Sequence, residues 1–139
     1  MITRESRRVA GFLLVVLPSV LYGGLFLLSQ LIDDRSGYMA NPLRQNLFRA
    51  GHAHAGVRLV LSLIALRYVD EANLGPLWKW IVRLGIPSAA IFLPAALFFS
   101  VLTPTATQPN AFIHLAYVGA VVLAGSLLVL GIGLFGSHE

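Results

Sequence analysis

Four long apolar stretches dominate this 139-residue sequence and limit what it can fold into. A helix needs about 20 apolar residues to cross a hydrocarbon core of ~30 Å. The stretches that meet this length are 9–32, 47–66, 81–103 and 111–135. Within lipid, backbone polar groups must be satisfied inside a helix or a closed barrel. We therefore expect an all-α protein: a single membrane domain over residues 1–139, built as an integral membrane bundle of four transmembrane helices.

The composition agrees with this expectation. Apolar residues make up 57% of the chain and charged residues 12%, which is far from the usual composition of a water-soluble domain. The ten Lys and Arg are scattered and form no dense basic stripe, so we expect no nucleic-acid partner. The chain has no cysteine, which excludes disulfides, thiolate-ligated haem, iron–sulfur clusters and cysteine-based zinc sites.

The distribution of basic residues predicts the orientation. Cytoplasmic ends and loops of membrane proteins carry an excess of Lys and Arg. Six basic residues lie on the side that holds the N-terminus and two in the loops of the other side. The six are Arg4, Arg7, Arg8, Arg67, Lys79 and Arg83, and the two are Arg35 and Arg44. We expect both termini in the cytoplasm of a multi-pass protein of the cell membrane, the inner membrane if the chain is bacterial.

Four polar side chains interrupt the second stretch: Arg49, His52, His54 and Arg58. An arginine at the centre of a membrane helix costs about 2.5 to 3.5 kcal/mol, and such residues usually face a bundle interior or a water-filled cavity. Counted at ~1.5 Å per residue from Leu47, Arg58 lies about 16 Å along the stretch, near the bilayer midplane. Arg49 can reach the outer headgroups, whereas Arg58 marks a candidate site.

Helical spacing separates the two histidines of this stretch. His52 and His54 point roughly 200° apart, so they do not normally bind one ion together. His54, Arg58 and Ser62 repeat every fourth residue and form one polar stripe, with His52 on the other side. His54 is therefore the better ligand candidate. The small residues around it permit either close helix packing or a flat ligand lying against the backbone.

The fourth stretch adds His114, and Tyr117, one turn further along, is a candidate to donate a hydrogen bond to His114 or to a bound cofactor. The second and fourth stretches both run inward from the outer surface, so His54 and His114 begin at depths that differ by only ~4 Å. Two rows of small residues predict that these two helices are close partners. The rows are Gly51 and Ala55 on the second helix and Ala116, Ala120 and Ala124 on the fourth.

The acidic residues restrict the cofactor. All six lie at termini or connections: Glu5, Asp33, Asp34, Asp70, Glu71 and Glu139. The spans therefore offer no carboxylate-bridged metal pair and no Ser-His-Asp arrangement. Met1 and Met39 are the only methionines, so a thioether copper site could use only Met39. Imidazole ligation of haem b, with copper as the alternative, is the main option, and His54 and His114 are the candidate metal ligands.

Two resemblances accompany these residues. The run His54-Ala55-Gly56-Val57, entering after Phe48-Arg49, resembles the second helix of the catalytic subunits of haem–copper oxidases. In that family an early histidine on an inward-running helix ligates a low-spin haem, which implies such a role for His54. The chain lacks the family's copper-ligand histidines, so oxygen reduction is not implied. The opening Gly51-His52-x-His54 also resembles that of small uncharacterised four-helix bacterial membrane proteins.

The sequence leaves three functions open, and whether the protein is an enzyme stays undecided. The first is a b-type haem protein with His54 and His114 as axial ligands, which transfers electrons near the outer face; Arg58 or Arg49 would balance the propionates. The second is a non-enzymatic accessory subunit of a larger membrane complex, or a homo-oligomer. In the third, the histidines and Arg58 line a pocket for an anionic or quinone-like molecule or a copper ion.

Overall fold

The computed structural model describes residues 1–136. They form four long α-helices and two short 3-10 helices, without a β-strand in that range. The helices are α1 Arg4–Ile32, η1 Asp34–Ser36, α2 Pro42–Tyr68, α3 Pro76–Phe99, η2 Ala111–His114 and α4 Leu115–Phe135. The prediction of an all-α fold with four long helices is confirmed. The third apolar stretch was expected to continue to residue 103, but α3 ends at Phe99.

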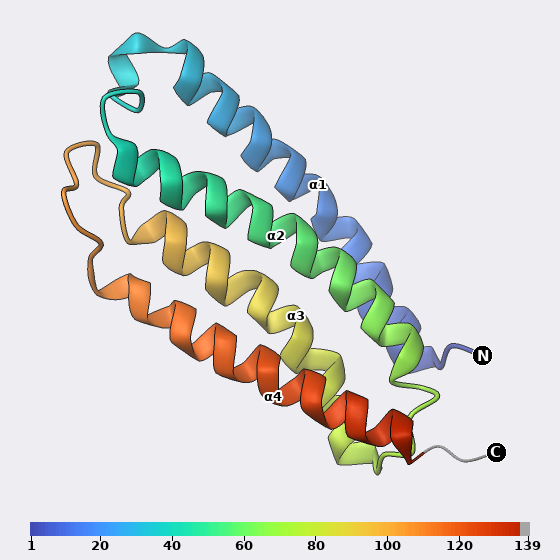
Figure 1. The fold of residues 1–139 in the computed structure, drawn as a ribbon. Coiled ribbons are helices and arrows are strands. Elements are labelled where there is room, and N and C mark those ends of the chain that lie inside the picture. Colours follow the sequence, from blue (N-terminus) through green and yellow to red (C-terminus); the bar gives the residue numbers. More distant parts are fainter. Residues whose placement is uncertain (137–139) are drawn as a thin grey trace.

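Three of the helical segments are long and apolar enough to cross a membrane: Arg4–Ile32, Pro76–Phe99 and Ala111–Phe135. These segments support a membrane protein in contact with lipid. α2 is of similar length but less apolar, because it carries four arginines and two histidines. It lies between α1 and α3 and runs antiparallel to both (Figure 1).

Local sequence signals determine where the helices begin. Thr3 accepts a hydrogen bond from the Ser6 N–H at the start of α1, and Asn41 accepts one from the Arg44 N–H at the start of α2. Side chains at this position satisfy backbone donors that the first helical turn leaves free. Pro42 and Pro76 occupy the first positions of α2 and α3, where a missing N–H costs nothing.

The four long helices lie side by side in chain order, as a row rather than a closed ring (Figure 1). α3 packs extensively against α2 and α4, whereas α1 packs mainly on α2. Within residues 1–136, no Cα atom of α1 lies within 8 Å of one in α4. Half of the most apolar window of α3 is buried in the protein, compared with 11% in α1 and 22% in α4. The two outer helices therefore present most of their apolar surface to their surroundings.

Three clusters of buried side chains hold the row together. One lies between α2, α3 and α4 and includes Ala65, Ile86 and Leu130. A second joins α1 to α2 and α3 through Leu13, Leu59 and Ala90. A third lies at the end where η1 and the α3–α4 connection meet, and contains Leu27, Tyr38, Phe48 and Val101.

Glycines allow α3 and α4 to approach closely. A Cβ atom added at Gly85 of α3 would overlap the Ser126 side chain of α4, and one at Gly119 of α4 would lie 3.0 Å from Leu93 Cδ1 of α3. Small residues are common where membrane helices touch. The sequence predicted α2 as the close partner of α4, and this is wrong: α3 lies between them, and α2 and α4 touch only slightly.

Candidate functional site

His52 lies against the backbone of α1. A Cβ atom added at Gly24 would be 3.2 Å from His52 Cε1 and 3.3 Å from Nε2, and one at Gly23 would be 3.5 Å from Nδ1. The imidazole therefore occupies space that the two glycines leave open. It also lines a cavity of about 230 Å³ between α1, α2 and α3, together with Val16, Pro94 and others.

His54 and Arg58 occupy a different side of α2. Leu61 and Ala65 belong to the cluster that contains Leu130 of α4. His54 and Arg58 precede them by seven residues, about two helical turns, and so share their side of the helix. This side faces the α4 end of the row, while His52 faces α1. The half-buried His54 and Arg58 thus form one polar stripe, from which His52 is excluded.

The Arg58 guanidinium is the main electrostatic anomaly of α2. Its Nε is buried and has no hydrogen-bond partner within residues 1–136. The hydroxyl of Ser62, which the sequence placed on the same stripe, donates instead to the Arg58 carbonyl oxygen at 2.7 Å. The buried Nε–H is therefore a free donor inside an apolar helix row.

His114 lies at the end of η2, where it is exposed. Its ring stacks on Tyr117, with centroids 6.1 Å apart and planes inclined by 27°. It also lines a shallow surface depression with Phe112, Leu115 and Val118. The structure thus brings His114 and Tyr117 together, as their spacing suggested. Within residues 1–136, no hydrogen bond or ring contact joins His114 to His54.

The small residues that were expected to bring α2 and α4 together have other surroundings. A Cβ atom at Gly51 would lie 2.9 Å from ring atoms of Phe98 and 3.4 Å from Leu97 Cβ, so this glycine accommodates α3. On α4, Ala120 and Ala124 are exposed. α3 is therefore the close neighbour of both helices.

Arg49 satisfies its side chain locally. Its Nε donates to the Gln45 carbonyl oxygen at 3.0 Å and its Nη2 to Asn46 Oδ1 at 3.3 Å, both at an exposed position. The expectation that Arg49 reaches the outer headgroups stays a prediction. The fourth histidine, His138, lies outside the described residues.

The described residues contain no group of three or more His, Cys, Asp or Glu side chains arranged to hold a metal ion. A site with two imidazole ligands is a smaller arrangement, and His54 with His114 as its ligands stays a prediction. The candidate site that the geometry supports is the Arg58–His54 stripe of α2.

A buried polar network at the other end of the row was not predicted. Arg83 Nη2 lies 2.7 Å from Asp70 Oδ1, and these side chains are only 6% and 2% exposed. The Thr3 N–H donates to Asp70 Oδ2 at 2.7 Å, and the hydroxyls of Thr3 and Ser6 donate to Oδ1 at 3.0 and 2.9 Å. Arg83 Nε also donates to the Ser6 hydroxyl at 2.9 Å. We call these four residues the Asp70 network.

Hydrogen bonds decide the ionisation state of Asp70. Burial alone raises its pKa, but bonds from the Thr3 N–H, the Arg83 guanidinium and the two hydroxyls together lower the pKa below its ordinary value. The carboxylate therefore remains ionised at neutral pH. The sequence placed Asp70 in a connection and assigned it no role; its position just past the end of α2 was the one available signal.

Arg44 is a second buried charge that sequence reasoning assigned to a loop. It lies in the first turns of α2 and is 4% exposed. Its Nε donates to the Val101 carbonyl oxygen at 3.2 Å, and its guanidinium carbon lies 5.0 Å from the centre of the Phe48 ring. Asn41 Nδ2 donates to the carbonyl oxygens of Pro104 and Ala106 nearby. These contacts fasten the α3–α4 connection to the start of α2.

Comparisons with protein-family models, with curated proteins and with solved structures find no match for this chain.

Proposed function

We propose that all four long helices cross the bilayer and that α2 holds a lipid-soluble ligand carrying hydrogen-bond acceptors. The observation that supports this proposal is the buried, unpartnered Nε of Arg58. An unsatisfied buried donor costs about 1 to 3 kcal/mol, and more when the group is charged. A bound acceptor offsets this cost, so the residue has a physical reason to recruit one.

The position of Arg58 keeps it away from both membrane surfaces. α2 spans Pro42–Tyr68, so at 1.5 Å per residue Arg58 lies about 24 Å from its start and about 15 Å from its end. Charged groups at such depths face a protein interior or a cavity. A ligand that reaches Arg58 must therefore be soluble in the hydrocarbon core.

The chemistry of the stripe indicates the ligand class. A guanidinium binds carboxylate or phosphate oxygens through paired N–H donors, and it also donates to carbonyl oxygens such as those of a quinone. His54 lies one turn away on the same side of α2 and supplies a second donor or acceptor. An anionic or quinone-like molecule with a long apolar part fits both groups.

Haem b is the first of the two specific cofactors that the sequence suggested for His54. A haem takes an imidazole as axial ligand and carries two propionate carboxylates. His54 and Arg58 have the chemistry for these two roles, and electron transfer near the outer face rests on the same proposal. Copper bound by His54 and His114 is the alternative cofactor. Apart from His54 and Arg58, no residue of α2 is needed to bind either haem or copper.

The orientation is also part of the proposal. Arg4, Arg7 and Arg8 precede the apolar part of α1, and α4 ends at the same end of the row (Figure 1). The excess of basic residues at this end favours the cytoplasm for both termini of a cell-membrane protein. Cysteine labelling tests this, because the native chain has no cysteine. Met39→Cys should react only from outside and Glu71→Cys only from inside.

Purification in a mild detergent, followed by solvent extraction and mass spectrometry, tests the ligand proposal. The wild-type protein should carry one lipid-soluble anionic or quinone-like molecule per chain, and Arg58→Leu should lose it. Arg67→Leu is the matched control, because Arg67 is a half-exposed arginine of the same helix in an ion pair with Glu71.

Three outcomes would overturn the ligand proposal. One is an identical set of extracted molecules from the wild type and Arg58→Leu. Another is equal loss from Arg58→Leu and Arg67→Leu, which would indicate a general charge effect. The third is a co-purifying protein that only Arg58→Leu loses, which would make the chain an accessory subunit.

A further inference from the structure

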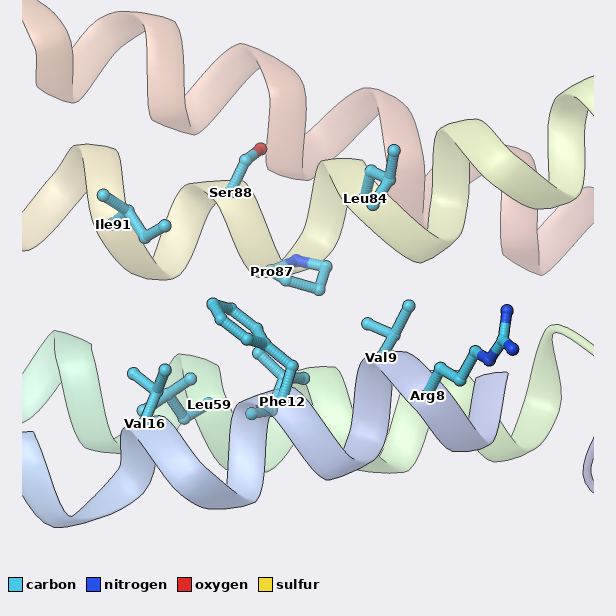
Figure 2. Close-up of a pocket in the computed structure, with 10 residues that line it drawn as sticks. Arg8, Val9, Phe12, Val16, Leu59, Leu84, Pro87, Ser88 and Ile91 are labelled. Carbon is cyan, nitrogen blue, oxygen red and sulfur yellow. The ribbon is translucent and has the colours of Figure 1, made fainter. Parts of the chain in front are cut away.

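An apolar groove lies on the other side of α2 from the Arg58–His54 stripe. It is a groove of about 490 Å³ between α1 and α3, floored by Leu59 of α2. Figure 2 shows Phe12 and Val16 of α1 on one side and Pro87 and Ile91 of α3 on the other. Apart from Arg8 and Ser88, every side chain that lines the groove is apolar. The full set is Arg8, Val9, Phe12, Leu13, Val16, Leu59, Leu84, Pro87, Ser88 and Ile91.

The packing of the helices explains why this groove exists. α1 and α3 both pack on α2 but touch each other little. They are joined at one end by the Asp70 network, in which Arg83 of α3 donates to Ser6 of α1 at 2.9 Å. Beyond this link the two helices leave a groove between them, and the buried Leu59 of α2 lies at its base.

A positive charge lies at the linked end of the groove. Arg8 is exposed and makes no hydrogen bond or ion pair within residues 1–136. Its neighbour Arg7 is exposed as well, as is Arg4 one turn earlier. Basic side chains at the cytoplasmic surface attract anionic lipid headgroups, at about 1 kcal/mol per residue. The mouth of the groove is therefore complementary to a phosphate.

The length of the groove matches one leaflet. Along α1 it extends from Arg8 to Val16, which is about 12 Å at 1.5 Å per residue. Half of a ~30 Å hydrocarbon core is about 15 Å. Val16, Leu59 and Ile91 also line the 230 Å³ cavity that contains His52, so an apolar chain has room to continue a little further.

The lining of the groove indicates its occupant. A groove of about 490 Å³ with apolar walls, which follows about 12 Å of α1, has room for an extended hydrocarbon chain. The exposed Arg8 at one end favours a chain that carries an anionic headgroup.

We propose that this groove binds an anionic phospholipid of the N-terminal leaflet, with its phosphate at Arg8 and one acyl chain between Phe12 and Ile91. The site is independent of the ligand proposed at Arg58, because the two lie on different sides of α2. Arg8 supplies the charge selectivity, and the apolar walls supply most of the contact area.

Native mass spectrometry of the detergent-purified protein, titrated with phosphatidylglycerol or phosphatidylcholine, tests this proposal. The wild type should bind one phosphatidylglycerol about tenfold more tightly than phosphatidylcholine, a difference of ~1.4 kcal/mol. Both lipids carry a phosphate, but the choline of phosphatidylcholine cancels the net negative charge that Arg8 attracts. Arg8→Gln should remove this preference. Arg35→Gln, an arginine at the opposite end of the row, should retain it.

A second pair of variants tests the groove itself. Val16→Phe should fill the groove and prevent binding of the first phosphatidylglycerol, whereas Val15→Phe should not, since Val15 is 79% exposed and lies outside the lining. Circular dichroism checks that both variants keep their helices. If Val16→Phe does not fold, the comparison of Arg8→Gln with Arg35→Gln alone tests the lipid site.

Four results would overturn the lipid site. The first is equal affinity of the wild type for the two lipids, and the second is an equal loss of phosphatidylglycerol preference in Arg8→Gln and Arg35→Gln. The third is wild-type lipid binding by a folded Val16→Phe variant. The fourth is a Val16→Phe variant whose only change is from dimer to monomer. The last result would assign the groove to a second copy of the chain.

Discussion

Asp70 and Arg83 form a buried ion pair, with Oδ1 and Nη2 2.7 Å apart, that joins the α2–α3 connection to α3. Thr3 and Ser6 of the α1 end donate hydrogen bonds to the same carboxylate. α1 packs mainly on α2 and touches α3 little elsewhere. The Asp70 network is thus the main polar link between α1 and α3, and it sets where the α1–α3 groove begins.

Asp70→Asn should destabilise the protein substantially. It removes the charge that compensates Arg83 while leaving the guanidinium buried, and breaking such a pair from one side costs about 3 to 5 kcal/mol. The free energy of unfolding, measured by titration of the detergent-solubilised protein with sodium dodecyl sulfate, checks this value.

Glu71→Gln is the control for this measurement. Glu71 forms an ion pair with Arg67 at 2.7 Å, but both side chains are about half exposed. Exposed pairs contribute about 0 to 1 kcal/mol. A similar loss of stability in Asp70→Asn and Glu71→Gln would mean that the Asp70 network is not a stabilising element.

The contribution of Asp70 should depend on pH in one direction. Its pKa in the folded protein lies below the ordinary value, because hydrogen bonds from Thr3, Arg83 and Ser6 outweigh the effect of burial. The stabilisation is therefore complete above the unfolded pKa of about 3.9 and is lost as the pH falls through the folded pKa. The difference in unfolding free energy between the wild type and Asp70→Asn should be constant from pH 7 to 5 and should shrink below about pH 4. A constant difference down to pH 2 would contradict the assignment.

Gly85→Ala should weaken the contact between α3 and α4. A Cβ atom at this position overlaps the buried Ser126 side chain, and overpacking of this kind costs about 1 to 3 kcal/mol. Gly131→Ala on α4 is the matched control, because nothing lies within 4 Å of its added Cβ; the gain in helix propensity should stabilise it by about 0.5 to 1 kcal/mol. Unfolding titrations give the free energy of unfolding of both variants. Equal values for Gly85→Ala and Gly131→Ala would refute the close packing of α3 against α4.

Hydropathy alone predicted the four long helices and their antiparallel order. The reason is that a span needs only length and apolar character, which stretches such as 9–32 and 111–135 display directly. The helix starts were less well predicted: the second stretch was expected to begin at residue 47, but α2 begins at Pro42. The direction in which each helix packs was not predictable in the same way. α4 is apolar on all sides, so its sequence does not distinguish the face that meets α3 from the face that meets lipid.

The candidate site was predicted in part. Spacing alone separated His52 from His54, because side chains two positions apart on a helix point in nearly opposite directions. The structure places His52 against α1. Arg58 stood out because a charge near mid-span is costly. The Asp70 network could not be predicted, since Thr3, Asp70 and Arg83 meet only after the chain has folded back on itself, over separations of 67 and 80 residues.

The haem prediction has a direct spectroscopic test. Imidazole-ligated haem gives a Soret band, so protein purified from haem-replete cells should be coloured, and His54→Ala or His114→Ala should lose the band. His52→Ala should weaken it at most, because His52 lies on the α1 side of α2. Colourless protein, or full haem binding by the His54→Ala, His114→Ala double variant, would remove haem from the possible ligands at Arg58.

The melting temperature of Arg58→Leu tests the central claim most directly. If Arg58 holds a ligand, Arg58→Leu should melt several degrees below the wild type in mild detergent, where bound molecules are retained, because the variant lacks the stabilisation that a ligand gives to the folded state. After exhaustive delipidation the order should reverse, since leucine removes a buried donor that has no partner. An Arg58→Leu variant that melts above the wild type under both conditions would contradict the account.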